Sequence, residues 1–573
     1  MKNSESGRLA TLLQALKPSR FKTLPLNMTM DNWSKKALLV SGIFLLSLIL
    51  WRLVTVPALH PLRISPDQSM FVAIGQLILE GKRPYIDFFD VNPPLAFYIH
   101  IAPVLLAKYL AVTPPQAFWY TVTFLWLYSV IFSLWLLWRQ SNHRESFVFM
   151  PLIVSFSCLT LQLCSDDEFG QREHIYLLLF IPLFIVRWLR WQQLNLPKTA
   201  TIVAALIAAL GLFMKPSYLI TLAVLELAWL IDNRRWRNLF APEMIVLIVF
   251  GIIYAGCLLA MPQAMKNGYF GMMVPVFTLG YGEYGTSLMF QFVGWGPYWK
   301  DYFLLLIYTC SLGVILGRFS TLIMPLMAFT LLGFASYLLQ GQPWFNHALP
   351  FLAGVYMLAG VEAAIIVFIV RQLIQKFVKV FDAILLSALC LWQLQVHNND
   401  VTEQKKQVKE APKLTLMNIG YTVNLPKADL PELALEIFKY TEPGEQVLIM
   451  TRSIAPGYPL LLQTRRRPAS RYLHAMLLPT TIFARDTTKS QVMKDKMDGF
   501  KEQILAEYRE DIENNKPPLI LIQAPRIYDI VNEGDFIRNV ILYDYQYAGT
   551  VEDHRIYVRK DLPNCPPPIK EEH

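Results

Sequence analysis

Residues 65–100 read SPDQSMFVAIGQLILEGKRPYIDFFDVNPPLAFYIH and follow the first apolar segment of membrane length, residues 37–56. The stretch contains three aspartates, a Pro-Pro pair and several aromatic side chains. Ionisable side chains are costly in hydrocarbon, so these carboxylates are expected where the chain leaves the membrane. The stretch therefore predicts a loop with chemistry to perform at a membrane surface.

The composition indicates a polytopic membrane protein. The chain has 573 residues, of which 54% are hydrophobic and 17% charged, and its mean hydropathy is +0.36. Apolar runs recur over the first 400 residues, whereas residues 398–573 contain many charges and no run long enough to span a bilayer. The chain thus divides into a membrane part and a soluble part of one-domain size. Five of the six cysteines lie in apolar segments, which argues against a disulfide framework.

The amino terminus predicts the orientation. Residues 1–36 are basic and polar, and no small-residue cleavage site follows the apolar segment 37–56, which is typical of an uncleaved signal anchor. Lys35 and Lys36 flank the start of that segment. The positive-inside rule then places the amino terminus in the cytoplasm and residues 65–92 outside.

The later apolar segments predict the number of spans. If residues 94–110 lie along the outer interface and do not cross, every later cluster of basic residues falls inside. We therefore expect a helical membrane domain of about eleven spans over residues 37–397, with residues 398–573 as an outer α/β domain. The expected segments after 37–56 are 94–110, 116–138, 147–163, 175–188, 199–214, 217–231, 244–261, 302–316, 321–339, 348–370 and 380–396.

This topology brings polar residues together on the outer side. They come from the first loop, from the motif SDDEFGQREH at 165–174, from a Lys-Pro junction between two short helices, and from two later loops. A transporter would more often place such groups near the middle of the membrane. Their convergence predicts an active site at the outer surface, with these candidates: Asp67, Asp90, Asn92, Asp167, Arg172, His174, Lys215, Glu283 and His347.

The motifs of the membrane part resemble those of the C-type glycosyltransferase superfamily, which includes protein O-mannosyltransferases and the aminoarabinose transferases of lipid A. An outer-loop aspartate opens a helix, and an extended stretch ends in D-x-x-P-P-L. Asp67-Gln68 stands where the superfamily has Asp-Glu, and Asn92 stands where it has the Lys or His before Pro-Pro-Leu. The stretches DEFGQREH and PWFNHALP are similar to those of bacterial members.

The resemblance implies a C-type fold and an enzyme that moves a sugar from a polyprenyl-phosphate donor to a glycan, lipid or protein of the cell envelope. It implies Asp67 as the base that takes the acceptor proton, with Asp90 and Asp167 as further catalytic carboxylates. Arg172, His174 and Lys215 are candidates to bind the donor phosphate. Asn92, Glu283 and His347 complete the predicted substrate-binding set, although Asn92 removes a cation expected near the lipid phosphate.

No cofactor and no metal-ligand spacing is identified in the sequence. The run Asp166, Asp167 and Glu168 is a candidate to bind an acceptor or a divalent cation, because hard cations prefer clustered carboxylates. The expected partners are the lipid-linked donor, the envelope acceptor and membrane lipid, with no nucleic acid. The expected location is the cytoplasmic membrane.

Each candidate also has a purely structural interpretation. Asp67 follows Ser-Pro and precedes an apolar helix, as a helix cap would. Arg172 and His174 belong to a charged cluster that could anchor the next span, and Lys215 could extend to the headgroups. Trp344 and His347 could form an aromatic-belt pair. The aromatic, Gly-rich stretch 262–300 could cover a lipid-sugar site or pack as an interfacial segment.

The soluble part reads as mixed α and β. The pattern predicts helices over 430–440 and 489–514 and strands over 447–450, 519–523, 540–543, 547–551 and 555–559. It contains no phosphate loop, metal-ligand spacing or nucleophile elbow. The basic run Arg465, Arg466, Arg467 and Arg471 could contact an anionic glycan or lipid headgroup, or lie in solvent. We expect this domain to recognise the acceptor or to shield the site.

Two other classes of function stay open at this point. A transporter or flippase of a lipid-linked sugar would use the external carboxylates to bind substrate without chemistry. A non-catalytic envelope scaffold would use neither. Internal repeats would favour transport, and the sequence has none that is evident.

Overall fold

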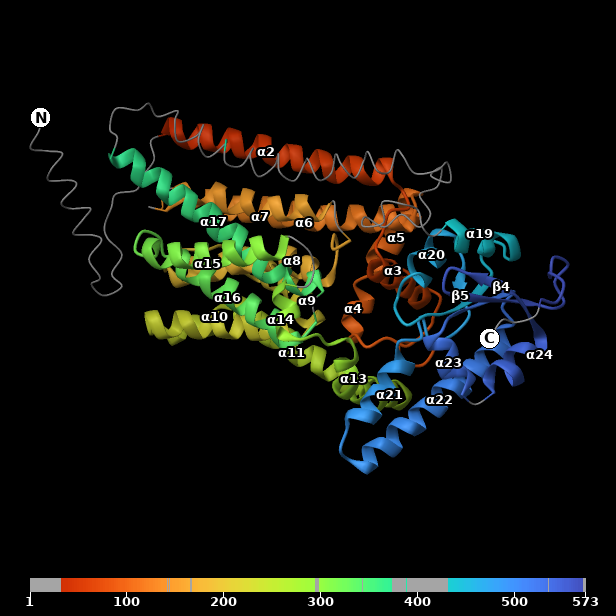
Figure 1. The fold of residues 1–573 in the computed structure, drawn as a ribbon. Helices are drawn as coiled ribbons and strands as arrows, with labels where there is room; N and C mark the ends of the chain where they lie inside the picture. The colour runs from red at the N-terminus through yellow and green to blue at the C-terminus, as the bar shows by residue number, and fades with distance from the viewer. Residues whose placement is uncertain are drawn as a thin grey trace, which may run out of the picture.

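The fold is described from a computed structural model of the chain. The structure describes residues 32–373 and 431–569, apart from residues 142, 144, 165, 166, 294–297, 343 and 534, and also residue 388. A helical bundle forms the amino-terminal part, and a smaller α/β domain lies beside one end of it (Figure 1). Three short helices of the first loop lie between the two (Figure 1).

Seven helices of the described residues are long and apolar enough to cross a membrane. Two of them form the centre of the bundle: 94% of the span in α8 (Arg172–Trp191) and 89% of that in α7 (Phe149–Leu163) with its preceding turn are buried. By contrast, only 11% of the span in α11 (Pro242–Ala260) is buried. The others are α2 (Asn32–Leu59), α6 (Pro114–Trp138), α16 (Ile323–Gln340) and α17 (Phe345–Leu373).

The helices of the bundle correspond roughly to the predicted apolar segments. Three shorter apolar helices, α9 (Lys198–Met214), α10 (Ser217–Asn233) and α15 (Tyr298–Leu316), complete the bundle, while the predicted last span, 380–396, lies outside the described residues except for residue 388. Residues 94–110, predicted not to cross, form the short helices α4 (Pro94–Tyr98) and α5 (Ile101–Leu110). Together with α3 (Pro66–Leu79) they lie at the end of the bundle nearest the α/β domain (Figure 1).

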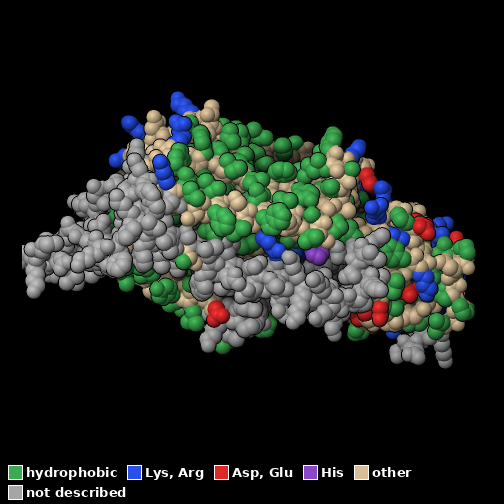
Figure 2. All heavy atoms as spheres, turned by 90° about the horizontal axis from the view of Figure 1, so that it is seen from above, with side chains coloured by type: hydrophobic (Ala, Val, Ile, Leu, Met, Phe, Trp, Pro, Cys, Tyr) green, Lys and Arg blue, Asp and Glu red, His purple; other side chains and the backbone are tan. Residues whose placement is uncertain are grey.

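Charge and hydrophobicity are separated on the surface. Figure 2 shows hydrophobic side chains over the middle of the bundle, with Lys and Arg gathered at the end away from the α/β domain. Within the bundle, the buried guanidinium of Arg187 in α8 pairs with Glu226 of α10 at 2.6 Å and with Glu243 of α11 at 2.7 Å. Because all three side chains are almost fully buried, this network ties three helices together away from water.

The stretch 262–300 is mostly helical where the structure describes it. Its helices are α12 (Gln263–Lys266), the π-helix η3 (Asn267–Met273), α13 (Val274–Gly280), the 3₁₀ helix η4 (Tyr281–Tyr284) and α14 (Leu288–Val293). Helix α13 packs against α21 (Leu477–Thr487) of the α/β domain. A Cβ at Gly280 would come 2.4 Å from the carbonyl oxygen of Thr480, so this contact requires glycine.

The α/β domain contains a mixed sheet of order β2-β1-β3-β5-β4. Strands β1 (Gln446–Met450) and β3 (Leu519–Gln523) are parallel, and β5 (His554–Arg559) pairs antiparallel with β3 and β4 (Tyr545–Val551). The short strand β2 (Arg467–Pro468) pairs with β1. The helices are α19 (Pro431–Tyr440), α20 (Gly457–Gln463), α21, α22 (Gln491–Asn515) and α23 (Arg526–Asn532).

One predicted strand is wrong. Residues 540–543 are helical, in the π-helix η6 (Ile537–Ile541) and α24 (Leu542–Asp544). Ile537, Val540 and Ile541 are buried together. Their spacing of three and four residues is the helical period. This period becomes visible only when Ile537 is included, because the run 540–543 alone is too short to distinguish a helix from a strand.

Candidate functional site

The candidate site lies at the end of the bundle that faces the α/β domain. Its first carboxylate, Asp67, stands in the first turn of α3, directly after Pro66 at the start of the helix. A carboxylate is favoured there by the helix dipole. The N-cap residue of α3 is Ser65, and Asp67 instead accepts a hydrogen bond at Oδ2 from Nε2 of Gln171, 2.9 Å away. Helix capping therefore does not account for Asp67.

The environment of Asp67 makes it a better base than an ordinary aspartate. Burial raises the pKa of this carboxyl above its usual range, and the hydrogen bond from Gln171 and the charge of Arg172 only partly offset that effect. A raised pKa strengthens the tendency of the carboxylate to accept a proton. The side chain is only half-buried, so it stays within reach of a ligand.

The second carboxylate, Asp90, belongs to a tight turn before α4. Its Oδ1 accepts hydrogen bonds from the backbone N–H of Asn92 at 2.9 Å and from Nδ2 of Asn92 at 2.6 Å. Its Oδ2 lies 3.8 Å from Nε2 of His474, which belongs to the α/β domain. Burial opposes ionisation of Asp90, but the nearby His474 and the hydrogen bonds from Asn92 outweigh it and lower the pKa of this group. Asp90 is therefore held as a carboxylate.

Arg172 is linked to Asp90 through Asn92. Its Nη1 donates a hydrogen bond to Oδ1 of Asn92, and its guanidinium lies 5.5 Å from the ring centre of Phe71. Its buried Nε has no hydrogen-bond partner. A guanidinium has five N–H donors, so Arg172 retains donors for an anionic ligand, and arginine binds phosphate and carboxylate groups in a bidentate manner.

A second cation lies beside this group, where α9 ends and α10 begins. Lys215 donates through Nζ to Oε1 of Glu173 at 3.0 Å and to Oε1 of Gln340 at 2.6 Å. An ammonium has three N–H donors, so one remains. The buried His347 interacts with the charges of Lys215 and Glu173, and its ring lies 5.4 Å from that of Trp344. The structure thus brings Lys215 and His347 together at one wall of the site.

His174 has a different environment. Its Nδ1 accepts a hydrogen bond from the backbone N–H of Gly170 at 3.0 Å, and its Nε2 lies 3.2 Å from Oγ1 of Thr160. Both ring nitrogens are therefore engaged within the protein and hold the turn that precedes α8. A phosphate contact by His174 stays a prediction, and its observed contacts position the start of the helix that carries Arg172.

The other two predicted residues, Glu283 and Asp167, come from a later loop and from the turn before α8. Glu283 is at the boundary with the α/β domain, where Oε1 accepts hydrogen bonds from Arg452, at 3.0 Å, and from Arg526. Asp167 is half-buried in the turn before α8, and Asp166 lies outside the described residues. Among the described residues, the acidic and imidazole side chains that meet closely enough to hold a metal ion are Glu552, Asp553 and His554, in the remote hairpin of β4 and β5.

Sequence reasoning missed three residues of the site. Gln171 lies in the same motif as Arg172 and directly precedes helix α8. This position could have identified it as a site residue. Gln340 ends α16 and begins the polar stretch QGQPWFNH at 340–347, but no pattern within that stretch distinguishes it as a site residue. His474 comes from the α/β domain and carried no signal in the sequence, because its role depends on how the two parts meet.

The comparisons with known proteins show the fold. No family model and no curated protein sequence matches the chain. The crystal structure of ArnT from Cupriavidus metallidurans bound to undecaprenyl phosphate superposes with a TM-score of 0.55 at 11% identity, covering 92% of this chain and 99% of that one. ArnT from the same organism in the apo state gives a TM-score of 0.52 at 11% identity, covering 90% and 97%. The predicted fold, a helical membrane bundle followed by an α/β domain, is thereby confirmed, and the chain shares it with ArnT over both parts.

Proposed function

We propose that this protein is a membrane glycosyltransferase that moves a sugar from a polyprenyl-phosphate donor to an acceptor in the cell envelope, on the side of the cytoplasmic membrane where the α/β domain lies. The observation that carries the proposal is a half-buried carboxylate with a raised pKa, Asp67, beside a guanidinium with free donors, Arg172. This is the pairing of base and phosphate ligand that the reaction needs. The donor class is supported by the undecaprenyl phosphate bound to ArnT, which shares the fold.

The transfer step needs one base. As the acceptor oxygen forms its bond to the anomeric carbon of the sugar, the acceptor O–H gives its proton to Asp67. At the same time, the bond between that carbon and the phosphate oxygen breaks, and its electron pair leaves with the lipid phosphate. The products are the glycosylated acceptor and the polyprenyl phosphate, and Asp67 later returns its proton to solvent.

The departing phosphate needs positive charge. Arg172 and Lys215 each keep N–H donors that their protein partners do not use. Asp90 and Asn92 orient the guanidinium of Arg172, and Glu173 and Gln340 orient the ammonium of Lys215. Cations preorganised in this way stabilise the charge that develops on the leaving group. Asn92 thus supports a phosphate ligand without being one, and the cation expected at its own position is supplied by Arg172.

The experiment that tests the proposal follows the sugar itself. Full-length protein in envelope lipid extract is supplied with a panel of polyprenyl-phosphate sugars that carry radiolabel in the sugar. The wild-type chain is compared with Asp67→Asn and with Asp87→Asn. Asp87 is a matched control because it lies in the same loop and is paired with Arg83, 3.1 Å away.

The proposal expects label to reach an acceptor or water with the wild type and with Asp87→Asn. It expects a loss of about 100-fold or more with Asp67→Asn, since general base catalysis contributes roughly 10²–10⁴-fold. Tight donor binding without turnover by any form of the protein would instead favour a transporter or a scaffold.

A further inference from the structure

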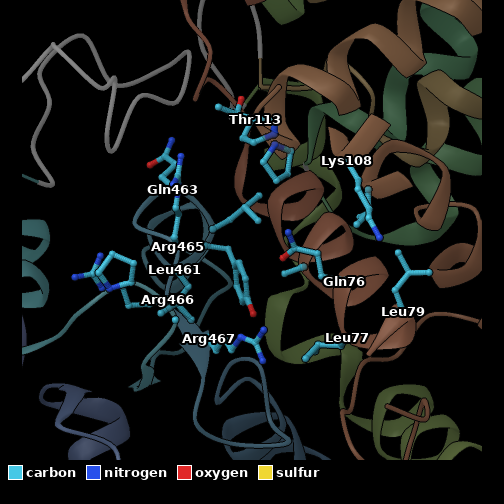
Figure 3. A pocket seen from close by; sticks show the side chains of 18 of the residues that line it. Gln76, Leu77, Leu79, Lys108, Thr113, Leu461, Gln463, Arg465, Arg466 and Arg467 are labelled. Atoms are coloured by element: carbon cyan, nitrogen blue, oxygen red, sulfur yellow. The ribbon is translucent and has the colours of Figure 1, made fainter. Parts of the chain in front are cut away.

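A cavity of about 950 Å³ lies between the first-loop helices and the α/β domain, away from the candidate site. One wall comes from α3 and α5, and the facing wall from α20 and the residues that follow it, up to Pro468 (Figure 3). Asp67 is in the first turn of the 14-residue helix α3, whereas this cavity is lined by its second half, through Gln76 and Leu77. At 1.5 Å per residue the two ends of α3 are about 20 Å apart.

The charge that lines the cavity is mainly positive. Lys108 reaches it from α5, and Arg465, Arg466 and Arg467 reach it from the α/β domain (Figure 3). The one acidic side chain in the lining, Glu80, pairs with Arg467 at 2.8 Å. A phosphate placed here would therefore meet cations that the protein does not neutralise.

Two of these cations are available to a ligand. Arg466 is committed to the protein, because Nε donates to Oγ1 of Thr441 at 3.0 Å and the side chain is buried. Lys108 and Arg465 are exposed, and within the described residues neither side chain forms a hydrogen bond or ion pair. Arg465 also has a φ of +59°, a backbone conformation that glycine adopts more readily. A long cationic side chain therefore occupies a position that the fold alone would leave to glycine.

Most of the remaining lining is apolar, apart from Gln76, Thr113 and Gln463. Leu77, Leu79 and Leu105 line the wall from the first-loop helices, and Leu461 and Leu462 the wall from α20. Leu79 and Leu105 remain 46% and 37% exposed. Just beyond them on α5, Tyr109 and Leu110 are 80% and 51% exposed. An apolar surface of this kind beside a bundle end is expected at the level of the lipid headgroups.

We propose that this cavity binds an anionic glycerophospholipid from the membrane leaflet next to the α/β domain. Lys108 and Arg465 hold its phosphate from opposite walls, and its acyl chains lie along the leucines of α3 and α5. A soluble phosphate has no apolar part to contact the apolar wall. The headgroup of a zwitterionic lipid carries a positive charge that Lys108 and Arg465 would repel. Since the lipid touches both walls, it fastens the α/β domain to the first-loop helices.

The test measures lipid retention by the full chain. Protein purified in a neutral detergent is titrated with short-chain phosphatidylglycerol or phosphatidylcholine, and bound lipid is counted by native mass spectrometry. The double variant Lys108→Gln and Arg465→Gln is compared with Lys489→Gln and Arg538→Gln, two exposed cations of the α/β domain that do not line the cavity. Gel filtration and Tm establish that each variant is folded, and the charge-retaining pair Lys108→Arg and Arg465→Lys is a second check.

The wild type, the control pair and the charge-retaining pair should prefer phosphatidylglycerol. The neutral double variant should bind it about 30-fold more weakly, because each cation near an anionic lipid contributes roughly 5-fold. Equal retention of both lipids by the wild type, or unchanged retention by the folded double variant, would overturn the proposal. Complete displacement of the lipid by millimolar inorganic phosphate would also contradict it, because the site would then recognise phosphate alone. Asp67→Asn should retain the lipid as the wild type does, so failure of this inference and failure of the proposed transfer are distinguishable.

Discussion

Nε2 of His474 lies 3.8 Å from Oδ2 of Asp90, and the two side chains are only 6% and 4% exposed. One residue belongs to the α/β domain and the other to the first loop of the membrane part. Next to this pair, the backbone N–H of Phe89 donates to the carbonyl oxygen of Arg471 at 2.8 Å, and the rings of Phe89 and Tyr472 stack at 5.1 Å. The α/β domain is therefore part of the candidate site rather than an appendage to it.

His474 should act as a positioning residue. We expect His474→Ala to lower sugar transfer about 10-fold or more, because Asp90 would lose a partner that keeps it ionised while it orients Asn92 and, through it, Arg172. His474→Gln retains an N–H donor and should recover part of that loss. The control is His554→Ala, which should leave transfer unchanged. His554 is a buried histidine of strand β5 and pairs with Asp553. Equal losses in the alanine and glutamine variants would contradict a role through the polar contact with Asp90.

The pH dependence of transfer should report Asp67. The base must be ionised, and burial raises its pKa, so transfer should fall as the pH drops through a value above the usual range for aspartate. Asp87, whose pKa is lowered in the folded protein by its bonds to Arg83 despite some burial, should add nothing to this limb. The pH profile of the wild type and of Asp87→Asn checks this. A profile that stays flat down to pH 4 would show that another group is the base.

The buried ion pairs of the bundle should matter for stability and not for chemistry. Arg187→Met leaves Glu226 and Glu243 buried without their shared cation, which typically costs about 3–5 kcal/mol. Arg190, also paired with Glu243 but 22% exposed, is the matched comparison, and Arg190→Gln should cost less. The Tm of the purified proteins measures both. A larger loss of Tm in Arg190→Gln than in Arg187→Met would contradict this ranking.

The orientation of the chain in the membrane is open to a direct test. Helix α2 runs toward the α/β domain and α6 runs back, so Arg139 after α6 lies at the far end of the bundle (Figure 1). By the positive-inside rule we expect that end to face the cytoplasm. A reporter active only outside the cytoplasm should be active when fused after residue 569 and inactive when inserted next to Arg139. The opposite pattern would reverse the predicted topology.

The sequence predicted much of the membrane part because its signals are local. Helix length, apolar runs and basic clusters lie along the chain, and all but one of the predicted spans correspond to helices in the described residues. The structure also placed Asp67, Asp90, Asn92 and Arg172 in one group of contacts, as the shared outer side implied.

The features that the sequence could not predict depend on contacts between residues that are far apart in the chain. The engagement of Glu283 by Arg452 and Arg526, and of Asp90 by His474, requires knowing how the α/β domain meets the loops. The strand predicted over 540–543 was wrong because four apolar residues fit either period, and the helical partner, Ile537, lay outside the run considered. The arginine run at 465–467 indicated one cationic wall of the cavity. The sequence did not indicate that Lys108 lies on the facing wall.

The most direct test of the central claim is to measure donor binding and turnover together in folded Asp67→Asn. The account predicts a Kd for the polyprenyl-phosphate sugar close to that of the wild type, because Arg172 and Lys215 are intact, with sugar transfer reduced about 100-fold or more. Its Tm should be no lower than that of the wild type, because a carboxyl whose pKa is raised by burial is less favourable as an anion in the folded state. Wild-type turnover by Asp67→Asn would contradict the account.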